Sequence, residues 1–313
     1  MIRLCNEILP NETSDKFVAV TIGDLGENDR TKIFDIVAAA PPLYRDLFFR
    51  FADKINITCT ESSGMFLRPG CNLPDGKTIS ETSQIRLNLV NDRVNPRGAF
   101  YTFFHEAAHM IDWYLGQGKS YFTSYTGDLS QELYDSLEMD VRNKLIEIAR
   151  EKVACPPSKI SDSEADDLVI RVVENIIAGE RMTRNNVVTA ADELQLATGQ
   201  EMRARLRGND APDRNKDNMV NVSSIFEGIT NKALRCGCTD NHKPYYWYKK
   251  CGRISGAHQR EFFANHYAYA MLGNQVALEN ERQYFPSAIV ILDEMINAMR
   301  DIALGMGAEN DEK

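Results

Sequence analysis

The pattern His-Glu-Ala-Ala-His at residues 105–109 has the residue types and the spacing of a zinc-binding helix. On an α-helix, His105 and His109 would lie about 40° apart around the axis, so both imidazoles could reach one Zn²⁺ at about 2.0–2.1 Å. Glu106 would point roughly 100° away from His105, where it could reach a metal-held water without ligating the metal. The alternative is an ordinary surface helix with two histidines and a solvated glutamate.

The residues around this pattern predict a buried helix, which argues against the surface alternative. Asn95-Pro96 supplies an N-cap followed by proline at the first helical position, and Gly116 supplies a stop. The segments 99–104 and 110–115 are apolar on most sides, as expected of a helix in a core. Two histidines and a glutamate inside such a helix cost desolvation free energy unless something binds them, and a metal ion accounts for all three.

Asp112, three residues after His109, lies on the same stripe of the predicted helix. We interpret it as a carboxylate that supports a metal ligand from behind, or as a buried capping partner. Direct ligation and an ordinary helix-face position are the alternatives.

A catalytic zinc needs a third protein ligand and an open position for water. The best candidate is Glu261, the acidic residue of a second apolar helix predicted over residues 259–271, in which Ala264 and Ala268 would allow close approach to the first helix. A lone carboxylate among phenylalanine, alanine and tyrosine is poor core material unless it is paired or metal-bound. The alternative is a first-turn glutamate that only complements the helix dipole. His266 lies about 140° from Glu261 around the helix, so we do not expect it in the same site.

The combination of His-Glu-x-x-His at 105–109 and Glu-Phe-Phe-Ala at 261–264 resembles the gluzincin-type zinc metallopeptidases. More narrowly, it resembles the lethal-factor-like catalytic domains found in bacterial toxins and beside phage head-morphogenesis proteins. Three further stretches resemble that family's helix and loop before the third ligand, its Gly-His-Ser-x-x-Tyr-Trp stretch, and the ending before its last helix: residues 225–231, 241–247 and 284–286.

The resemblance covers about residues 43–116 and 221–305. Asn241 stands where the family has glycine, and residues 117–220 have no counterpart. The family implies an α+β, zincin-like fold with a small mixed or antiparallel sheet over the motif helix and a mostly helical remainder, here with a large helical insertion. It also implies one catalytic Zn²⁺, with these ligands: His105, His109 and Glu261.

By the same resemblance, Glu106 is the general base, and a tyrosine hydroxyl near the third-ligand helix stabilises the oxyanion. Tyr246 is the aligned tyrosine, and His242 would assist or orient it. A tyrosine suits this role because it donates a hydrogen bond while staying neutral at pH 7. The alternative is that residues 245–248 form an aromatic wedge that only packs a loop.

The seven cysteines are odd in number and scattered, without a secretory apolar segment, which indicates reduced thiols in a cytosolic setting. They are Cys5, Cys59, Cys71, Cys155, Cys236, Cys238 and Cys251. A second, structural zinc site at Cys236, Cys238 and Cys251 with His242 is an alternative that the irregular spacing disfavours.

Composition is that of an ordinary soluble protein. The chain has 313 residues, of which 43% are hydrophobic, enough for one large core or two modest ones. Without a transmembrane-length apolar run or a signal-peptide pattern, we expect a cytoplasmic protein; association with phage and export without a signal peptide are alternatives. The net charge of −9 disfavours nucleic acid and is compatible with a mild preference for basic substrates. The expected partner is a protein or peptide substrate, with neither nucleic acid nor membrane; the oligomeric state is not indicated.

Periodicity predicts a helix over residues 35–52, broken at Pro41-Pro42, and strands at 55–60, 65–68 and 84–90. In a zincin-like fold an edge strand would pair with the backbone of an extended substrate, and either 65–68 or 84–90 could be that edge.

Amphipathic patterns then predict helices over residues 129–148, 166–180 and 190–206, the last capped by Thr189 and closed by Gly208. This helical insertion is either a scaffold or a lid that forms one wall of the active site. The predicted domains are 1–118 (zincin subdomain with sheet and motif helix), 119–220 (helical insertion) and 221–313 (helical subdomain with the third ligand).

These features together predict a zinc metalloendopeptidase in which Glu106 activates a zinc-bound water. One alternative is a non-catalytic phage structural or accessory protein in which the metal braces two helices. Another is a pseudo-protease that binds peptides without cleaving them. The intact motif, including its base, favours the enzyme.

Overall fold

The computed structural model describes residues 25–61, 64–72, 78–79, 83–125, 127–153, 161–208, 216–236, 242, 244–248 and 254–308. These residues confirm the α+β class: they are mostly helical, with one small three-stranded mixed sheet. The chain divides into two compact units. Unit 1 contains Met1–Leu129, Phe263–Leu278 and Leu292–Lys313, and unit 2 contains Ser130–Phe262 and Glu279–Ile291. Of the described helices, none combines the length and the apolar character needed to cross a membrane.

The described part of unit 1 starts with two helices separated by prolines. α3 (Glu27–Ala39) ends before Pro41, and α4 (Pro42–Arg50) begins with proline at its first position. Proline fixes φ and biases the residue before it away from the helical region, so the predicted break is confirmed. The predicted start at Asp35 is wrong, because α3 begins at Glu27 with acidic residues in its first turn, which complement the helix dipole.

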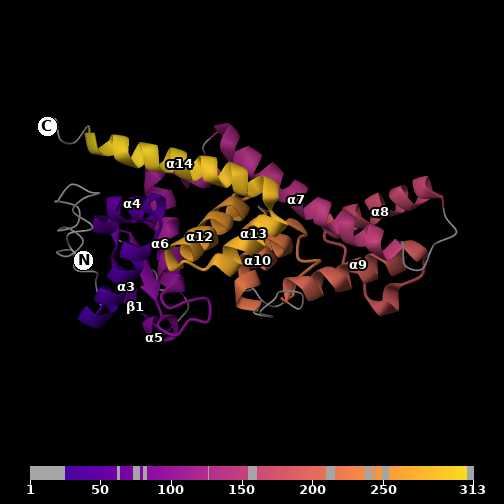
Figure 1. The fold of residues 1–313 in the computed structure, drawn as a ribbon, viewed down its shortest axis with the longest axis horizontal. Helices are drawn as coiled ribbons and strands as arrows, with labels where there is room; N and C mark the ends of the chain where they lie inside the picture. The colour runs from indigo at the N-terminus through magenta and orange to yellow at the C-terminus, as the bar shows by residue number, and fades with distance from the viewer. Residues whose placement is uncertain are drawn as a thin grey trace. The chain divides into compact units, whose positions relative to one another are not determined.

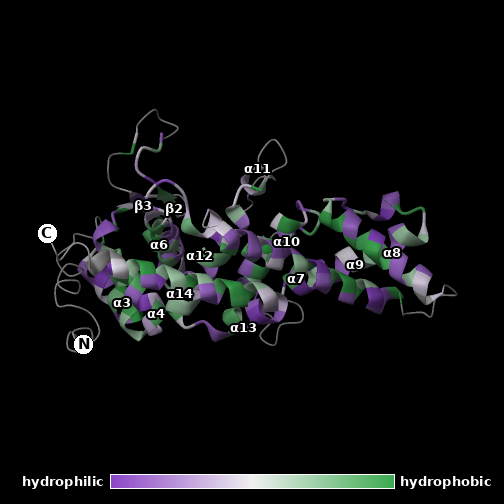
Figure 2. Cartoon of the chain, turned by 90° about the horizontal axis from the view of Figure 1, so that it is seen from above, coloured by the Kyte–Doolittle hydropathy of each residue, from purple (hydrophilic) through white to green (hydrophobic). Residues whose placement is uncertain are grey.

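The sheet contains all three predicted strands in shorter form. β1 (Ile57–Cys59) pairs parallel to β3 (Gln84–Leu87), and β2 (Met65–Leu67) pairs antiparallel to it, so the strand order is β1-β3-β2. The predicted extension of the third strand to Val90 is wrong, since the strand ends at Leu87 and a short helix, α5 (Leu89–Asp92), begins at Leu89. β3 is therefore central and β2 is an edge strand, and Figure 2 shows both beside helix α6.

The motif helix α6 (Tyr101–Leu115) begins later than predicted. Asn95-Pro96 does not start it; the helix follows Phe100, whose backbone is left-handed (φ 65°, ψ 22°). The physical reason is Asp92, a buried carboxylate whose two oxygens accept hydrogen bonds from the backbone N–H groups of the helix's second and third residues (2.8 and 2.9 Å). This remote side chain satisfies donors that a helix start leaves open.

The end of α6 and its packing agree with the sequence. Gly116 follows the last helical residue, and a Cβ there would lie 1.9 Å from the carbonyl oxygen of Ser120, so only glycine fits. On the core side, the rings of Phe103 and Phe104 pack against Phe48 of α4, with centroids 6.1 and 6.0 Å apart. These contacts bury one face of α6 and leave the opposite face to carry the polar residues.

Unit 2 contains the predicted central helices. α8 (Asp162–Ile177) and α9 (Ala190–Leu206) begin with capping boxes. Ser161 exchanges hydrogen bonds with Glu164, and Thr189 exchanges them with Asp192, so the predicted Thr189 cap is confirmed. α8 and α9 lie side by side in Figure 1. The helices of this stretch are α7 (Gly127–Val153), α8 (Asp162–Ile177), α9 (Ala190–Leu206), α10 (Val220–Ile229) and α11 (Pro244–Trp247).

The last described helices are α12 (Ala257–Leu272), α13 (Gln275–Tyr284) and α14 (Pro286–Ala308). In unit 2, the buried carboxylate of Asp140 on α7 accepts hydrogen bonds from the N–H groups of Ser287 and Ala288 (both 3.0 Å), which satisfies the first turn of α14. α12 is one uninterrupted helix, and the boundary between the residue ranges of the two units falls within it, between Phe262 and Phe263.

Candidate metal centre

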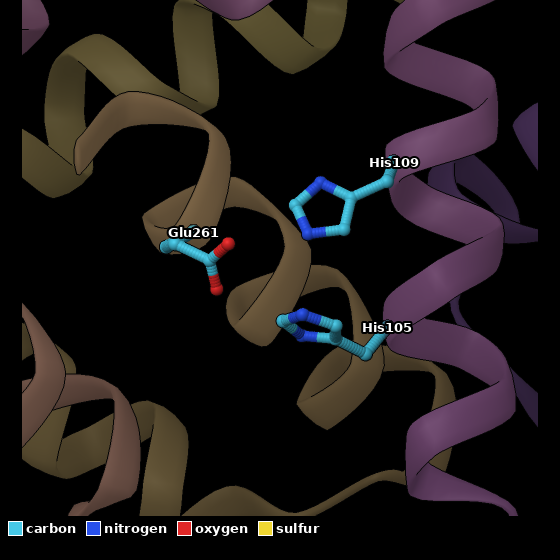
Figure 3. Close-up of side chains that lie close together, drawn as sticks. All are labelled: His105, His109 and Glu261. Carbon is cyan, nitrogen blue, oxygen red and sulfur yellow. The ribbon is translucent and has the colours of Figure 1, made fainter. Parts of the chain in front are cut away.

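α6 presents both motif histidines from one face, as their spacing predicts. The imidazole centroids of His105 and His109 are 4.7 Å apart and the rings are perpendicular. In Figure 3 both rings project from α6 toward Glu261 of α12. Tyr101 stacks on His105 at 6.1 Å, and Tyr121 packs edge-on against His109 at 6.4 Å. The two imidazoles are thus held in place by aromatic neighbours in the same unit.

The part of α12 that belongs to unit 1 is held by contacts within that unit. The Tyr101 hydroxyl of α6 donates a hydrogen bond to the side-chain oxygen of Asn265. Ala264 and Ala268, the small residues predicted to allow close approach, are fully buried. Glu261 lies four residues before Asn265 on the same helix, so it points from the same face about one turn earlier.

The three predicted ligands converge. One donor atom from each of His105, His109 and Glu261 lies within 4.8 Å of the other two, and no other such group occurs among the described residues. Ligand atoms around tetrahedral zinc are separated by about 3.3 Å, given bonds of about 2.0–2.1 Å, so small side-chain rotations would close the set. Two imidazoles and a carboxylate are also the donor chemistry of catalytic zinc sites with an open fourth position. The cluster can therefore bind a metal ion, and its donors fit zinc.

Glu106 is held against the edge strand. Its side chain is 8% exposed, and its Oε2 accepts a hydrogen bond of 2.7 Å from the backbone N–H of Phe66 in β2. Gly64, just before the strand, is required for this approach, because a Cβ there would lie 2.2 Å from the Thr102 methyl group and 3.2 Å from Glu106 Oε1. The edge strand thus fixes the orientation of the carboxylate that the motif assigns as general base.

The structure also brings the two predicted auxiliary residues to Glu261. The Tyr246 hydroxyl donates a hydrogen bond to Glu261 Oε1. The Nε2 atom of His242 lies 3.9 Å from Glu261 Oε2, and its ring stacks on Tyr246 with centroids 4.0 Å apart and planes 7° apart. A phenol and an imidazole are therefore available beside the candidate metal ligands.

The segment carrying Tyr246 is fixed by its neighbours. Trp247 is fully buried, and a Cβ on Gly228 would lie 2.9 Å from both Trp247 and His258, so glycine permits their contact. The Trp247 and His258 rings lie 4.7 Å apart, and burial lowers the pKa of His258 to about 4. The N–H of Ser255 donates a hydrogen bond to the backbone carbonyl of Trp247 (3.0 Å), and the Ser255 hydroxyl donates one to the backbone carbonyl of Tyr246. Trp247 therefore has the packing role that the aromatic-wedge alternative gives to residues 245–248, whereas the Tyr246 hydroxyl contacts Glu261.

Two other predicted residues have hydrogen-bond partners outside the ligand set. Asp112 is fully buried and accepts hydrogen bonds from the N–H (2.7 Å) and hydroxyl (2.6 Å) of Thr123, which is the capping role given as one alternative. These bonds anchor the turn next to Tyr121, which packs on His109. His266 contacts Tyr44 instead, with Nε2 2.8 Å from the tyrosine hydroxyl, as expected from its position around α12.

The alternative cysteine site falls largely outside the described residues. Cys238 and Cys251 are not described, and Cys236 is buried. His242, which such a site would need, lies beside Glu261.

Sequence reasoning missed the residues that position the site through backbone or long-range contacts. The Phe66 amide has no sequence signal, because every non-proline residue has an N–H. Gly64 had one, since a glycine at a strand end marks close backbone approach. The Tyr101–Asn265 bond joins residues far apart in sequence and needs the fold to be known.

Comparisons of the chain with protein-family models, with curated proteins and with solved structures gave no match. Its function is therefore inferred from the geometry of the site.

Proposed function

We propose that the chain is a zinc-dependent metallopeptidase of gluzincin type, with a zincin-like arrangement of sheet and motif helix that resembles the lethal-factor-like catalytic domains. One observation carries the proposal: His105, His109 and Glu261 converge on one point while Glu106 is held beside them by a strand edge. A structural metal site needs no such base and fills all four positions with protein atoms. These residues therefore support a catalytic metal site better than a structural metal that only holds two helices together.

Zinc, when bound by the two histidines and Glu261, supplies Lewis acidity and brings the pKa of a water in its open position toward about 7. Glu106 then accepts the proton of the attacking water and returns it to the leaving amine, which makes it base and acid in turn. Its hydrogen bond to the Phe66 amide orients the carboxylate before the substrate arrives. Pre-set orientation of this kind lowers the entropy cost of the proton transfer.

Tyr246 is the proposed donor to the oxyanion that develops on the peptide carbonyl. Its hydroxyl lies at Glu261, and the stacked His242 ring restricts its rotation. The hydroxyl has one proton, which it donates to Glu261 in the structure. With the Glu261 carboxylate bound to zinc, the hydroxyl would donate that proton to the developing negative charge instead.

The β2 edge is the proposed binding surface for the substrate backbone. β2 pairs with β3 on one side only, and on its other side the Phe66 N–H is already bonded to Glu106, so a substrate would pair with the backbone groups of this edge that flank Phe66. An extended peptide laid along this edge would form main-chain hydrogen bonds, which give affinity with little dependence on side chains.

The deciding experiment is the zinc content of the purified chain, measured by elemental analysis for the wild type, Glu261→Ala and the control Glu279→Ala. Glu279 is an exposed residue of α13 whose described ion pair is with Arg282. We expect about one zinc per chain in the wild type and the control and a large loss in Glu261→Ala, because two histidines alone bind zinc weakly. Full zinc in Glu261→Ala would remove this residue from the site. No zinc in the wild type after reconstitution, or no chelator-sensitive cleavage of an unfolded protein, would end the peptidase proposal.

A further inference from the structure

Four ring side chains follow one another along α6 at intervals of four residues. Tyr101 contacts His105 (6.1 Å between centroids), His105 contacts His109 (4.7 Å), and Tyr121 bridges His109 to Trp113 (6.4 and 5.4 Å). Residues four apart are separated by about 6 Å along a helix. This α6 stripe therefore extends about one turn beyond the candidate metal ligands at each end.

An arginine covers the Trp113 end of the α6 stripe. The Arg68 guanidinium carbon lies 5.2 Å from the Trp113 ring centroid, in a cation–π contact. Arg68 is exposed and directly follows the last residue of β2, the edge strand that also holds Glu106. A guanidinium lying on an aromatic face is fixed in orientation while its N–H donors stay available at its rim.

Arg68 differs from other arginines of the chain in its charge environment. Arg93 pairs with Asp29, and Arg142 pairs with Glu138, as is common in a chain with a net charge of −9. Within the part of the chain that the structure describes, Arg68 contacts no carboxylate. A cation that is oriented, exposed and free of an acidic partner can accept one from a ligand.

We propose that Arg68 determines specificity, by binding an aspartate or glutamate that lies two or three residues from the scissile bond of the substrate. The proposal rests on the proposed peptidase function and names its substrate class: peptides with an acidic side chain near the cleavage site. An extended peptide advances about 3.3 Å per residue. A carboxylate two or three residues from the scissile bond can therefore reach past the turn of α6 between His109 and Trp113 to the Arg68 guanidinium, which lies on the Trp113 ring. The planar fork of arginine favours a carboxylate over other acceptors, because it donates two parallel hydrogen bonds.

This local charge points in the opposite direction from the net charge. A chain at −9 would favour basic ligands at long range, but that field is screened within about 8–10 Å at physiological ionic strength. At contact distance the guanidinium next to the site decides which charge is accepted.

The test is selection of peptides from a displayed library of random dodecapeptides, by the full-length, zinc-reconstituted Glu106→Gln protein, which should bind without cleaving. The same selection is made with Arg68→Gln, Arg68→Lys and Arg68→Glu added, and with the control Arg30→Glu. Arg30 lies on α3 and takes part in none of the contacts described at the site. Circular dichroism confirms that each variant is folded.

We expect aspartate and glutamate to be enriched about threefold to tenfold at one position of the selected peptides. Arg68→Lys should weaken this preference, Arg68→Gln should abolish it, and Arg68→Glu should replace it with lysine and arginine. Arg30→Glu should leave it unchanged. An acidic preference that persists in Arg68→Glu, a selected set without acidic enrichment, or no peptide binding at all would overturn the inference.

The outcomes for the two proposals are separable. A protein that holds zinc and cleaves peptides without a preference dependent on Arg68 overturns the specificity inference alone. A protein that selects acidic peptides through Arg68 but neither holds zinc nor cleaves them overturns the peptidase proposal and leaves Arg68 as part of a peptide-binding surface.

Discussion

The Tyr246 hydroxyl donates a hydrogen bond to the carboxylate of Glu261, the side chain that faces the two motif histidines. The tyrosine and the proposed third ligand belong to different helices, α11 and α12, which Trp247 and Ser255 lock together. The proposed oxyanion donor and the proposed metal ligand are therefore placed by the same packing contacts. A change to the hydroxyl can be separated experimentally from a change to the ligand.

Replacing Tyr246 by phenylalanine should lower the kcat of peptide cleavage by about 10²- to 10³-fold, the cost of losing one oxyanion donor. The ring and its stacking on His242 remain, so zinc content should not change. The matched control is Tyr245→Phe, since Tyr245 is 68% exposed and adjacent. Kinetics and elemental analysis on the three proteins decide the matter. Loss of zinc in Tyr246→Phe would show that the tyrosine supports the ligand rather than the reaction.

Replacing Glu106 by glutamine should leave zinc bound while kcat/KM falls by about 10²- to 10⁴-fold, because an amide cannot accept the proton of the attacking water. Its amide oxygen can still accept the Phe66 N–H, so the edge strand should stay in place. Glu294→Gln, on an exposed position of α14, is the control. If Glu106→Gln loses its zinc, the roles of base and ligand have been assigned wrongly.

Replacing Gly64 by alanine should reduce cleavage by about tenfold or more without loss of zinc, because misplacing a catalytic group by a fraction of an ångström is costly. The new methyl group would meet the Thr102 methyl at 2.2 Å and Glu106 Oε1 at 3.2 Å, so β2 or the carboxylate must move. The control is Gly305→Ala, where a Cβ meets nothing within 4 Å.

A second substitution makes the Gly64 prediction sharper. Thr102→Ser removes the methyl group in the closest contact and keeps the hydroxyl that accepts a hydrogen bond from Asn95. Adding it to Gly64→Ala should therefore restore part of the activity. Equal activity in Gly64→Ala and the wild type would mean that the position of β2 does not control Glu106.

The sequence predicted the elements whose signals are local. The 105–109 spacing, the strands and the Thr189 cap depend on residues within a turn or two of each other. The helix and the cap lie where predicted, and the strands lie within the predicted ranges in shorter form. The start of α6 did not follow, because the donors at its first turn are satisfied by Asp92 across a loop rather than by the nearby Asn95-Pro96 signal.

At the candidate site, residue chemistry predicted the donor set but not its surroundings. Glu261 could be identified as the candidate third ligand because a carboxylate in an apolar helix needs a partner, and this follows from the residue types alone. The contacts of Arg68 with Trp113 and of Glu106 with Phe66 depend on where β2 lies beside α6. Such relations arise from tertiary packing, and a single sequence carries no periodicity that reports them.

Because His258 is buried, we expect the folded protein to lose stability in mild acid. Its ring is enclosed by Trp247, Tyr134 and Tyr248, with centroids 4.7, 5.3 and 5.5 Å away, and burial lowers its pKa from 6.5 to about 4. The folded state therefore keeps this imidazole neutral while the unfolded chain binds a proton below pH 6.5. The stabilisation is present above pH 6.5 and is lost as the pH falls toward 4, by about 3 kcal/mol in total.

The measurement is the free energy of unfolding of the metal-free protein by urea at several pH values between 4 and 7.5, for the wild type and His258→Asn. Chelation is required because proton and metal binding at the other histidines would otherwise contribute to the slope. Burial raises the pKa of Asp140, but this residue titrates in both proteins, so its contribution cancels in the difference between their unfolding free energies. Asparagine does not titrate, so His258→Asn should be less stable at pH 7.5 yet lose less stability on acidification. Parallel pH dependences in the two proteins would show that His258 is not neutralised by its aromatic surroundings.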